Sequence, residues 1–206
     1  MKPARVLLLC LLLSCSLAQA VEQFGYRVIE QLPHSRENFV QGLQIIDGQL
    51  YVSSGNYGVS HLTQYRFPEG RLVVSRKLHP RIFAEGVTVL GDRVYQLTWR
   101  NRMMLVYQRE HLQPDHTFPI PGEGWGRTSD GQSLIYSDGS DQLHFISPAS
   151  ERIERSIRVR ENGRPLQRLN ELEWIDGKVW ANIWQTDRIV IIDPATGEVS
   201  ALSLIH

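Results

Sequence analysis

Cysteine is nearly absent from this chain of 206 residues. The two thiols, Cys10 and Cys15, both lie close to the N-terminus. A chain cleaved after Ala20 would contain no cysteine, which excludes disulfides and thiolate metal ligands from the body of the protein. The seven histidines show no metal-ligand spacing either. We therefore expect no metal and no cofactor, and a fold that depends on its hydrophobic core.

Net charge and long apolar runs are also lacking. Lys and Arg together number 22, as do Asp and Glu, so no overall field favours nucleic acid or a membrane surface. The apolar run at residues 6–13 is too short to span a bilayer. Because Lys2 and Arg5 precede it and residues 18–20 (AQA) fit a cleavage site, residues 1–20 are predicted to be a secretory signal peptide.

A second interpretation of this leader remains open. Leu12 to Cys15 loosely resembles a bacterial lipoprotein box, in which Cys15 would carry a lipid anchor. Either interpretation places the body, residues 21–206, outside the cytoplasm as a secreted or periplasmic protein. No transmembrane segment is expected. The length and the apolar content of 42% suit one compact soluble domain.

No stretch shows a sustained 3.6-residue apolar period, so the pattern predicts an all-β fold. The chain instead contains a repeat of 40 to 45 residues. The repeat becomes visible when four segments are aligned, each with an apolar residue eight positions on: residues 41–43, 85–87, 125–127 and 170–172. A repeat of this length is typical of one β-propeller blade.

Each repeat predicts four short strands. The inner strand, such as 42–46, leads through a turn dipeptide such as Asp47-Gly48 or Asp176-Gly177, both of which tolerate the positive φ of a tight hairpin. The further strands are predicted at 50–54, 94–98, 134–137 and 179–183, then at 61–67, 103–108, 142–147 and 188–193, and finally at 71–78, 116–120, 152–159 and 198–204.

Four-stranded units repeated in this way close around a central channel in a β-propeller. A β-sandwich also has many short strands, but it does not require equal repeats. One further strand is predicted at 26–31, ahead of the first repeat. If that strand is the outer strand of a last blade, three strands that should follow Leu204 are missing, and the last blade is incomplete.

Four polar or aromatic residues occupy the same place in successive inner strands, and we expect them to meet at one point on the axis. They are Gln41, Glu85, Trp125 and Asn170. Trp99 and Trp184 end the second strands of the second and fourth repeats. The sequence therefore predicts a pocket with one carboxylate, two amides and several indoles.

Glu85 is the clearest candidate for chemistry. A carboxyl group enclosed by Phe83, Trp99 and Trp125 would be desolvated. Desolvation raises its pKa toward neutral pH, where the group can both take and give a proton. Two other interpretations stay open: Glu85 could simply hydrogen-bond strand ends in the channel, and each tryptophan could simply pack between blades. The glycine-rich segment 122–126 is not followed by a helical pattern, so it does not indicate a phosphate loop.

Several segments together resemble the plant and bacterial type of glutaminyl-peptide cyclotransferase. They are Phe39 to Leu43, Phe83 to Val87, Tyr95 to Trp99, Gly122 to Gly126, Ser137 to Ser140 and Leu169 to Ile192. The similarity extends from about Asn38 to Ser200. Its most specific part is LNELE at 169–173 with WANIWQTD at 180–187.

This resemblance implies a five-bladed propeller that works without metal and turns the N-terminal glutamine of peptides or proteins into pyroglutamate, releasing ammonia. It implies that Glu85 moves the proton between the two nitrogens. Gln41 and Asn170 would orient the amide and the amine. Five aromatic residues would shape and dry the pocket: Phe39, Phe83, Trp99, Trp125 and Trp184.

The chain departs from the family pattern in two places. Val40 stands where a threonine is expected, and the last blade with its Thr-Gly-Lys-x-Trp stretch is absent. Two alternatives to an active enzyme therefore remain: a non-catalytic propeller that binds peptides or glycans, and an inactive truncated cyclotransferase. We expect a monomer in each case.

Overall fold

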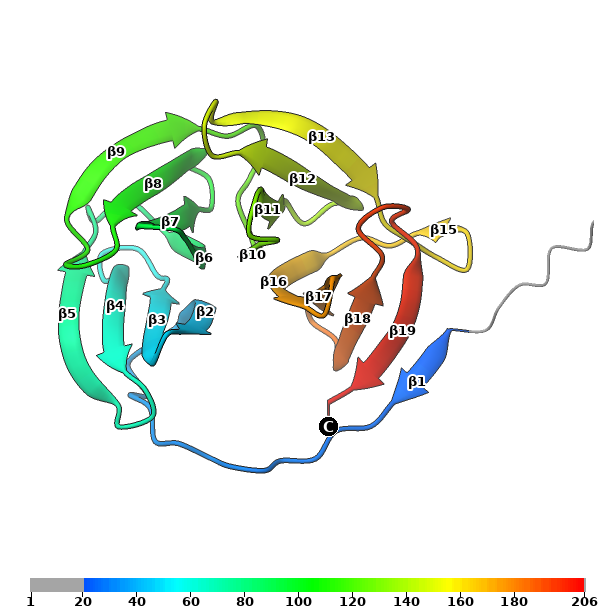
Figure 1. Cartoon of the computed structure of the whole chain (residues 1–206), viewed down its shortest axis with the longest axis horizontal. Coiled ribbons are helices and arrows are strands. Elements are labelled where there is room, and N and C mark those ends of the chain that lie inside the picture. Colours follow the sequence, from blue (N-terminus) through cyan, green and yellow to red (C-terminus); the bar gives the residue numbers. More distant parts are fainter. Residues whose placement is uncertain (1–20, 206) are drawn as a thin grey trace, which may run out of the picture.

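The strands form a ring of four sheets in the computed structural model, which describes residues 21–205 (Figure 1). We call each four-stranded sheet a blade. Blade 1 contains β2 (Val40–Ile46), β3 (Gln49–Ser54), β4 (His61–Arg66) and β5 (Arg71–Lys77). Blade 2 contains β6 (Ala84–Leu90), β7 (Arg93–Thr98), β8 (Met103–Gln108) and β9 (Pro114–Pro119).

The second half of the chain builds two further blades. Blade 3 contains β10 (Arg127–Ser129), β11 (Leu134–Ser137), β12 (Gln142–Ser147) and β13 (Arg152–Arg158), and blade 4 contains β16 (Leu169–Ile175), β17 (Lys178–Ile183), β18 (Arg188–Ile192) and β19 (Val199–Leu204). Residues 21–205 contain no helix that could cross a membrane. The predicted all-β propeller with four blades is therefore confirmed, whereas the predicted signal peptide lies outside the described residues.

Burial follows the position of a strand in its blade. The inner strand β6 is buried along nearly its whole length because blades 1 and 3 cover both of its faces. In the outer strand β13 only Ile153 and Ile157 are half-buried and the other residues are exposed, as expected at the solvent side of the ring. Two hairpin turns behave as predicted, with positive φ at both Asp47 and Gly48 and at both Asp176 and Gly177.

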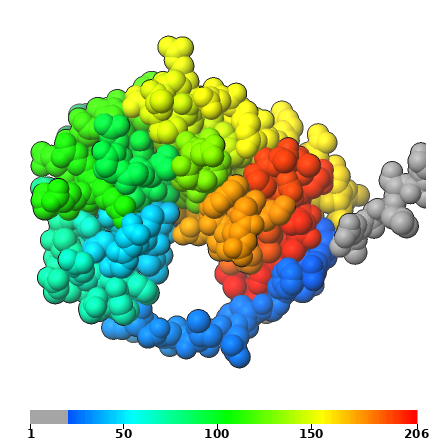
Figure 2. All heavy atoms as spheres, in the orientation of Figure 1, coloured from blue at the N-terminus to red at the C-terminus, as the bar shows by residue number. Residues whose placement is uncertain are grey.

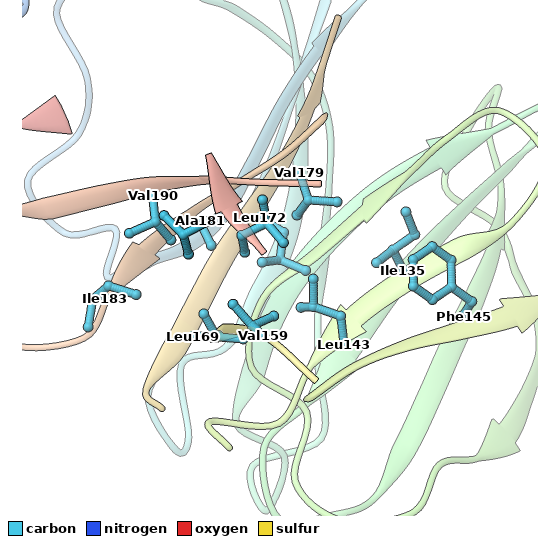
Figure 3. Packing of buried hydrophobic residues seen from close by; sticks show 12 residues of the cluster. Ile135, Leu143, Phe145, Val159, Leu169, Leu172, Val179, Ala181, Ile183 and Val190 are labelled. Carbon is cyan, nitrogen blue, oxygen red and sulfur yellow. The ribbon is translucent and has the colours of Figure 1, made fainter. Parts of the chain in front are cut away.

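The core lies between neighbouring blades. Figure 3 shows the cluster between blades 3 and 4, where Leu143 of β12 and Val159 face Leu169 of β16. Similar clusters join blade 1 to blade 2 and blade 2 to blade 3. At about 25 cal/mol per Å² of apolar surface, each interface contributes several kcal/mol to the stability of the ring.

Three glycines allow the inner strands to approach one another around the axis. A Cβ added at Gly126 would lie 1.8 Å from the carbonyl oxygen of Asn170, and those added at Gly42 and Gly86 would meet the next inner strand at 2.6 Å. The fourth repeat has Glu171 at this position. The glycines of blades 1, 2 and 3 therefore let each of these inner strands pack closely against the inner strand of the next blade.

The N-terminal segment differs from its prediction. Residues 26–31 form no strand, and β1 (Glu22–Phe24) instead pairs in parallel with β19. Alternating apolar residues predicted a strand at 26–31, but Val28 and Ile29 are 58% and 86% exposed, so no sheet face covers them. The segment that follows β1 crosses the open side of the ring between blades 4 and 1, beside the opening seen in Figure 2. Sequence reasoning also missed the hairpin of β14 (Arg160–Glu161) and β15 (Arg164–Pro165).

Candidate functional site

Breaks in strand pairing aim the predicted side chains at the axis. The β2–β3 register shifts between Val40 and Gly42, so Gln41 has no paired residue opposite it. Corresponding shifts occur around Glu85 in β6 and around Asn170 in β16. A β-bulge turns a side chain out of its normal alternation. Three of the predicted site residues, Gln41, Glu85 and Asn170, are therefore released from regular pairing.

These residues surround one cavity of about 340 Å³. All eight predicted site residues line it, together with Asn56, which was not predicted: Phe39, Gln41, Asn56, Phe83, Glu85, Trp99, Trp125, Asn170 and Trp184. They come from all four blades, as their equivalent places in the repeat predicted.

Glu85 lies buried at this cavity, with 5% of its surface exposed. Its Oε2 accepts a hydrogen bond of 2.7 Å from Nε2 of Gln41. Desolvation raises the pKa of Glu85 to about 8; the hydrogen bond from Gln41 opposes this shift, and the charge of Glu123 adds to it. Near neutral pH the carboxyl group is therefore mostly protonated and close to its point of half-titration.

Aromatic rings form the walls of the cavity. Phe83 makes edge contacts with Phe39, Tyr57 and Trp99, with ring centroids 5.4 to 6.3 Å apart. Trp125 meets Trp184 edge-on at 5.4 Å. Phe39 and Trp184 are about half exposed, so they form the rim. The rim is therefore an apolar surface that solvent can reach.

Asn170 is fixed through its backbone. Its carbonyl oxygen accepts a 2.8 Å hydrogen bond from Oγ of Ser137 in blade 3, and the same Oγ accepts a bond from the backbone N–H of Gly126. Ser137 thus joins β11, the turn before β10 and β16. The amide side chain of Asn170 is free to face the cavity.

Three further titratable residues of the inner strands are removed from solvent to different degrees: Arg127 is buried, whereas Glu171 and Glu173 are half-buried as whole residues. Desolvation raises the pKa of Glu171 well above its ordinary value and that of Glu173 to about 7, and it lowers the pKa of Arg127 to about 9. Both carboxyl oxygens of Glu171 are sealed from solvent. The nearby backbone N–H groups of Arg127 and Leu43 lower the pKa of Glu171, but neither donates a hydrogen bond of normal geometry to its carboxyl oxygens.

Two features of the site were missed from the sequence. Asn56 reaches the cavity from the loop after β3, where its backbone has a φ of 78°. The Asn-Tyr-Gly run after a predicted strand was the available signal, because Asn and Gly tolerate positive φ. The second feature is Glu123, whose carboxylate contacts the indoles of Trp99 and Trp125; no periodicity in the sequence marks it.

A larger and more open depression, of about 860 Å³, lies between blades 1 and 2. Charged and amide side chains such as Gln64, Arg93 and Asp115 line it, and none of the predicted residues does. Among residues 21–205, no three His, Cys, Asp or Glu side chains gather closely enough to hold a metal ion. The expectation of metal-free chemistry stays a prediction.

The arrangement around Glu85 suits proton transfer between two atoms of a small bound molecule. The carboxyl group is within reach of the cavity, its pKa is near neutral pH, and amides of Gln41 and Asn170 can orient polar groups beside it. No second buried carboxyl lines the cavity among the described residues.

Comparison with known proteins shows the family. The sequence profile of the glutamine cyclotransferase family matches residues 4–205. The glutaminyl-peptide cyclotransferase of Arabidopsis thaliana is 34% identical over 174 residues, which cover 84% of this chain and 54% of the relative. The chain thus spans about half the length of this curated relative.

Solved structures agree with this assignment. The crystal structure of Myxococcus xanthus glutaminyl cyclase matches with a TM-score of 0.82 at 32% identity, covering 89% of this chain and 78% of that one. The hydrazine synthase of Kuenenia stuttgartiensis matches with a TM-score of 0.58 at 14% identity, covering 88% and 53%. At that low identity the second likeness concerns the fold alone.

Proposed function

The chain belongs to the glutamine cyclotransferase family, and from this we propose that it cyclises the N-terminal glutamine of peptides or proteins to pyroglutamate and releases ammonia. Glu85 is the proposed catalytic residue. The observation that carries the proposal is a desolvated carboxyl group, with a pKa of about 8, at an aromatic cavity that also presents two amide side chains. A cavity of about 340 Å³ has room for a curled glutaminyl residue.

The reaction forms one bond and breaks another within the same residue. The substrate's α-nitrogen attacks the side-chain carbonyl carbon, a five-membered lactam closes, and the bond to the amide nitrogen breaks. The α-nitrogen must lose a proton and the leaving nitrogen must gain one. The ionised form of Glu85 takes the first proton and gives it to the leaving nitrogen, which departs as ammonia, so the enzyme returns to its starting state without a co-reactant.

The surrounding residues lower the barrier by positioning. Gln41 holds Oε2 of Glu85 at 2.7 Å, and it and Asn170 are proposed to orient the amide and the amine of the substrate. Phe39, Phe83, Trp99, Trp125 and Trp184 are proposed as the substrate-binding walls. Holding the ring-forming conformer in a closed space removes much of the entropy cost of the attack.

A direct test uses a synthetic peptide that begins with glutamine. Incubation with the protein should release one equivalent of ammonia and lower the peptide mass by the same amount. The matched control is the N-acetylated peptide, which has no nucleophilic amine and should stay unchanged. Equal rates with and without the protein would reject the proposal.

The second candidate function is a peptide- or glycan-binding propeller without turnover. The observation that favours it is the exposed aromatic rim of Phe39 and Trp184, each about half exposed, beside the equally exposed Tyr57. Titration calorimetry separates the two: binding of a glutamine peptide without product supports the second candidate, and heat from turnover supports the first.

We also propose that the protein acts as a monomer outside the cytoplasm. The leader pattern of residues 1–20 supports the location alone, with Cys15 as the alternative lipid anchor. Mass spectrometry of the mature N-terminus after bacterial export separates cleavage after Ala20 from lipidation of Cys15. An uncleaved chain would reject both.

A further inference from the structure

We propose that Glu123 is a positioning residue of the cavity, whose single carboxyl oxygen holds the indoles of Trp99 and Trp125 and whose charge acts on Glu85. This inference rests on the proposed function for its kinetic consequences and on geometry alone for its effect on the tryptophans. Glu123 does not line the cavity itself. It acts on the reaction only through the residues that do.

The geometry has one acceptor and two donors. Oε2 of Glu123 accepts a hydrogen bond of 2.7 Å from Nε1 of Trp99 and one of 3.0 Å from Nε1 of Trp125. Trp99 follows β7 in blade 2, whereas Trp125 precedes β10 in blade 3. One oxygen therefore fixes the relative orientation of two rings from different blades.

The backbone around Glu123 is itself held in place. Gly124 donates its N–H to the carbonyl oxygen of Trp99 at 3.1 Å, and a Cβ added at Gly124 would lie 2.8 Å from the carbonyl oxygen of Thr98. Gly122 has a φ of 73°, which glycine adopts without strain. The two glycines let the chain cross the end of blade 2 so closely that Glu123 reaches both indoles.

Fixing these two rings fixes most of the wall. Trp99 makes an edge contact with Phe83 at 5.5 Å, and Trp125 makes one with Trp184 at 5.4 Å. An indole that is not held has several rotamers, and ordering it on substrate binding would cost conformational entropy and weaken binding. The shared oxygen therefore pre-organises both sides of the cavity before substrate arrives.

The charge of Glu123 has a separate effect. Desolvation opposes ionisation, but the hydrogen bonds from Trp125 and Trp99 and the guanidinium of Arg100 outweigh it and hold the pKa of Glu123 below its ordinary value. The group is therefore an anion at neutral pH. Its charge disfavours ionisation of Glu85, which also faces Gln41 and lies close enough to Glu171 for the two carboxyl groups to repel.

Stability alone does not account for this arrangement. Arg100 pairs with Glu123 through Nε and Oε1 at 3.3 Å and stacks 4.0 Å over the ring of Trp99, but its side chain is largely exposed. Exposed ion pairs contribute roughly 0 to 1 kcal/mol. The stronger contacts of Glu123 are the two bonds to cavity residues, which involve the other oxygen.

Two substitutions separate geometry from charge. Glu123→Gln retains an oxygen that can accept from both indoles and loses the charge. Its tryptophan emission should match the wild type, while the limb of the kcat/KM profile that belongs to Glu85 moves to lower pH by about half a unit. Glu123→Ala loses both bonds, so its emission should shift to longer wavelength, acrylamide quenching should increase, and KM should rise about tenfold.

The control is Glu110→Gln, because the side chain of Glu110 is 85% exposed and does not line the cavity. It should change neither emission nor the pH profile. Unchanged emission and KM in a folded Glu123→Ala would overturn the positioning role, and so would emission changed equally in Glu123→Gln. If Glu123→Ala does not fold, the pH dependence of kcat/KM in Glu123→Gln tests whether the charge of Glu123 acts on Glu85. If the wild-type protein shows no turnover, the proposed function is rejected. The comparison of tryptophan emission between the variants then still tests whether Glu123 positions the two indoles.

Discussion

At the cavity, two carboxyl groups have pKa values shifted in opposite directions. Glu85 is desolvated and accepts one hydrogen bond, so it keeps its proton to about pH 8. Glu123 accepts bonds from two indoles and pairs with Arg100, so it ionises readily. Environments that separate the pKa values of neighbouring acids assign them different roles. In the proposed mechanism the carboxyl group of Glu85 moves the proton, and the anion of Glu123 positions the indoles of the cavity wall.

Glu85→Gln removes the proton-carrying group while keeping its size. We expect turnover of a glutamine peptide to fall by a factor of about 10³, because general acid–base catalysis contributes on the order of 10² to 10⁴. The amide can still bond to Gln41, so the circular dichroism spectrum should be unchanged. Glu154→Gln, at an exposed position on β13, serves as the control. Wild-type rates in the Glu85 variant would remove it from the mechanism.

Burial of Glu85 also links stability to pH. Its pKa rises from 4.5 unfolded to about 8 folded, so the native state holds a proton that the unfolded chain releases. This contribution is fully present below pH 4.5 and is lost as pH rises through 8, a change of roughly 4 to 5 kcal/mol at most. Urea unfolding from pH 5 to pH 9 should show wild-type stability falling faster than that of Glu85→Gln. Parallel curves would contradict the shifted pKa.

At the scale of strands, repeat spacing and turn chemistry predicted most elements to within one or two residues. The turns Asp47-Gly48 and Asp176-Gly177 are local, so their conformation is encoded in adjacent residues. The bulges at Gln41, Glu85 and Asn170 are not local. They lie where an inner strand packs closely against the inner strand of the next blade, and period-two alternation contains no sign of that contact.

The axial glycines allow a test of this close packing. Gly126→Ala places a Cβ 1.8 Å from the carbonyl oxygen of Asn170, which is backbone and cannot rotate away. We expect a loss of about 3 kcal/mol or more in unfolding free energy, because overpacking at a rigid contact forces strands apart. Gly25→Ala has no atom within 4 Å of the new Cβ and is the matched control. Chemical denaturation measures both, and equal stabilities would show that the strands can separate freely.

At the scale of the whole molecule, the sequence predicted the ring and its order of blades but not how the N-terminal segment attaches. Its apolar alternation suggested a strand at 26–31, whereas pairing occurs at β1, where β19 offers a free edge. Edge pairing depends on which backbone groups are unsatisfied elsewhere in the fold. The positions of Asn56 and Glu123 likewise depend on loops placed by the finished ring.

The segment between β1 and β2 should be the first site of proteolytic attack. Residues 25–37 contain no strand, and most of them are exposed. Proteases require an accessible, extended backbone. Brief digestion followed by mass spectrometry should locate the first cut within this segment, while the blades stay intact. Early cuts within the blades, for example in the turns of blade 3, would show that the ring opens more readily than its packing indicates.

The cavity takes side chains from both blades that border the open side of the ring: Phe39 and Gln41 from blade 1, Asn170 and Trp184 from blade 4. A ligand that contacts the residues of both blades therefore links blade 1 to blade 4 across the open side of the ring. Its binding free energy then adds to the cohesion of the first and last blades, by about 2.7 kcal/mol at a hundredfold excess over Kd. The ligand-bound protein should therefore have a higher Tm than the free protein, with the added stability concentrated between blades 1 and 4.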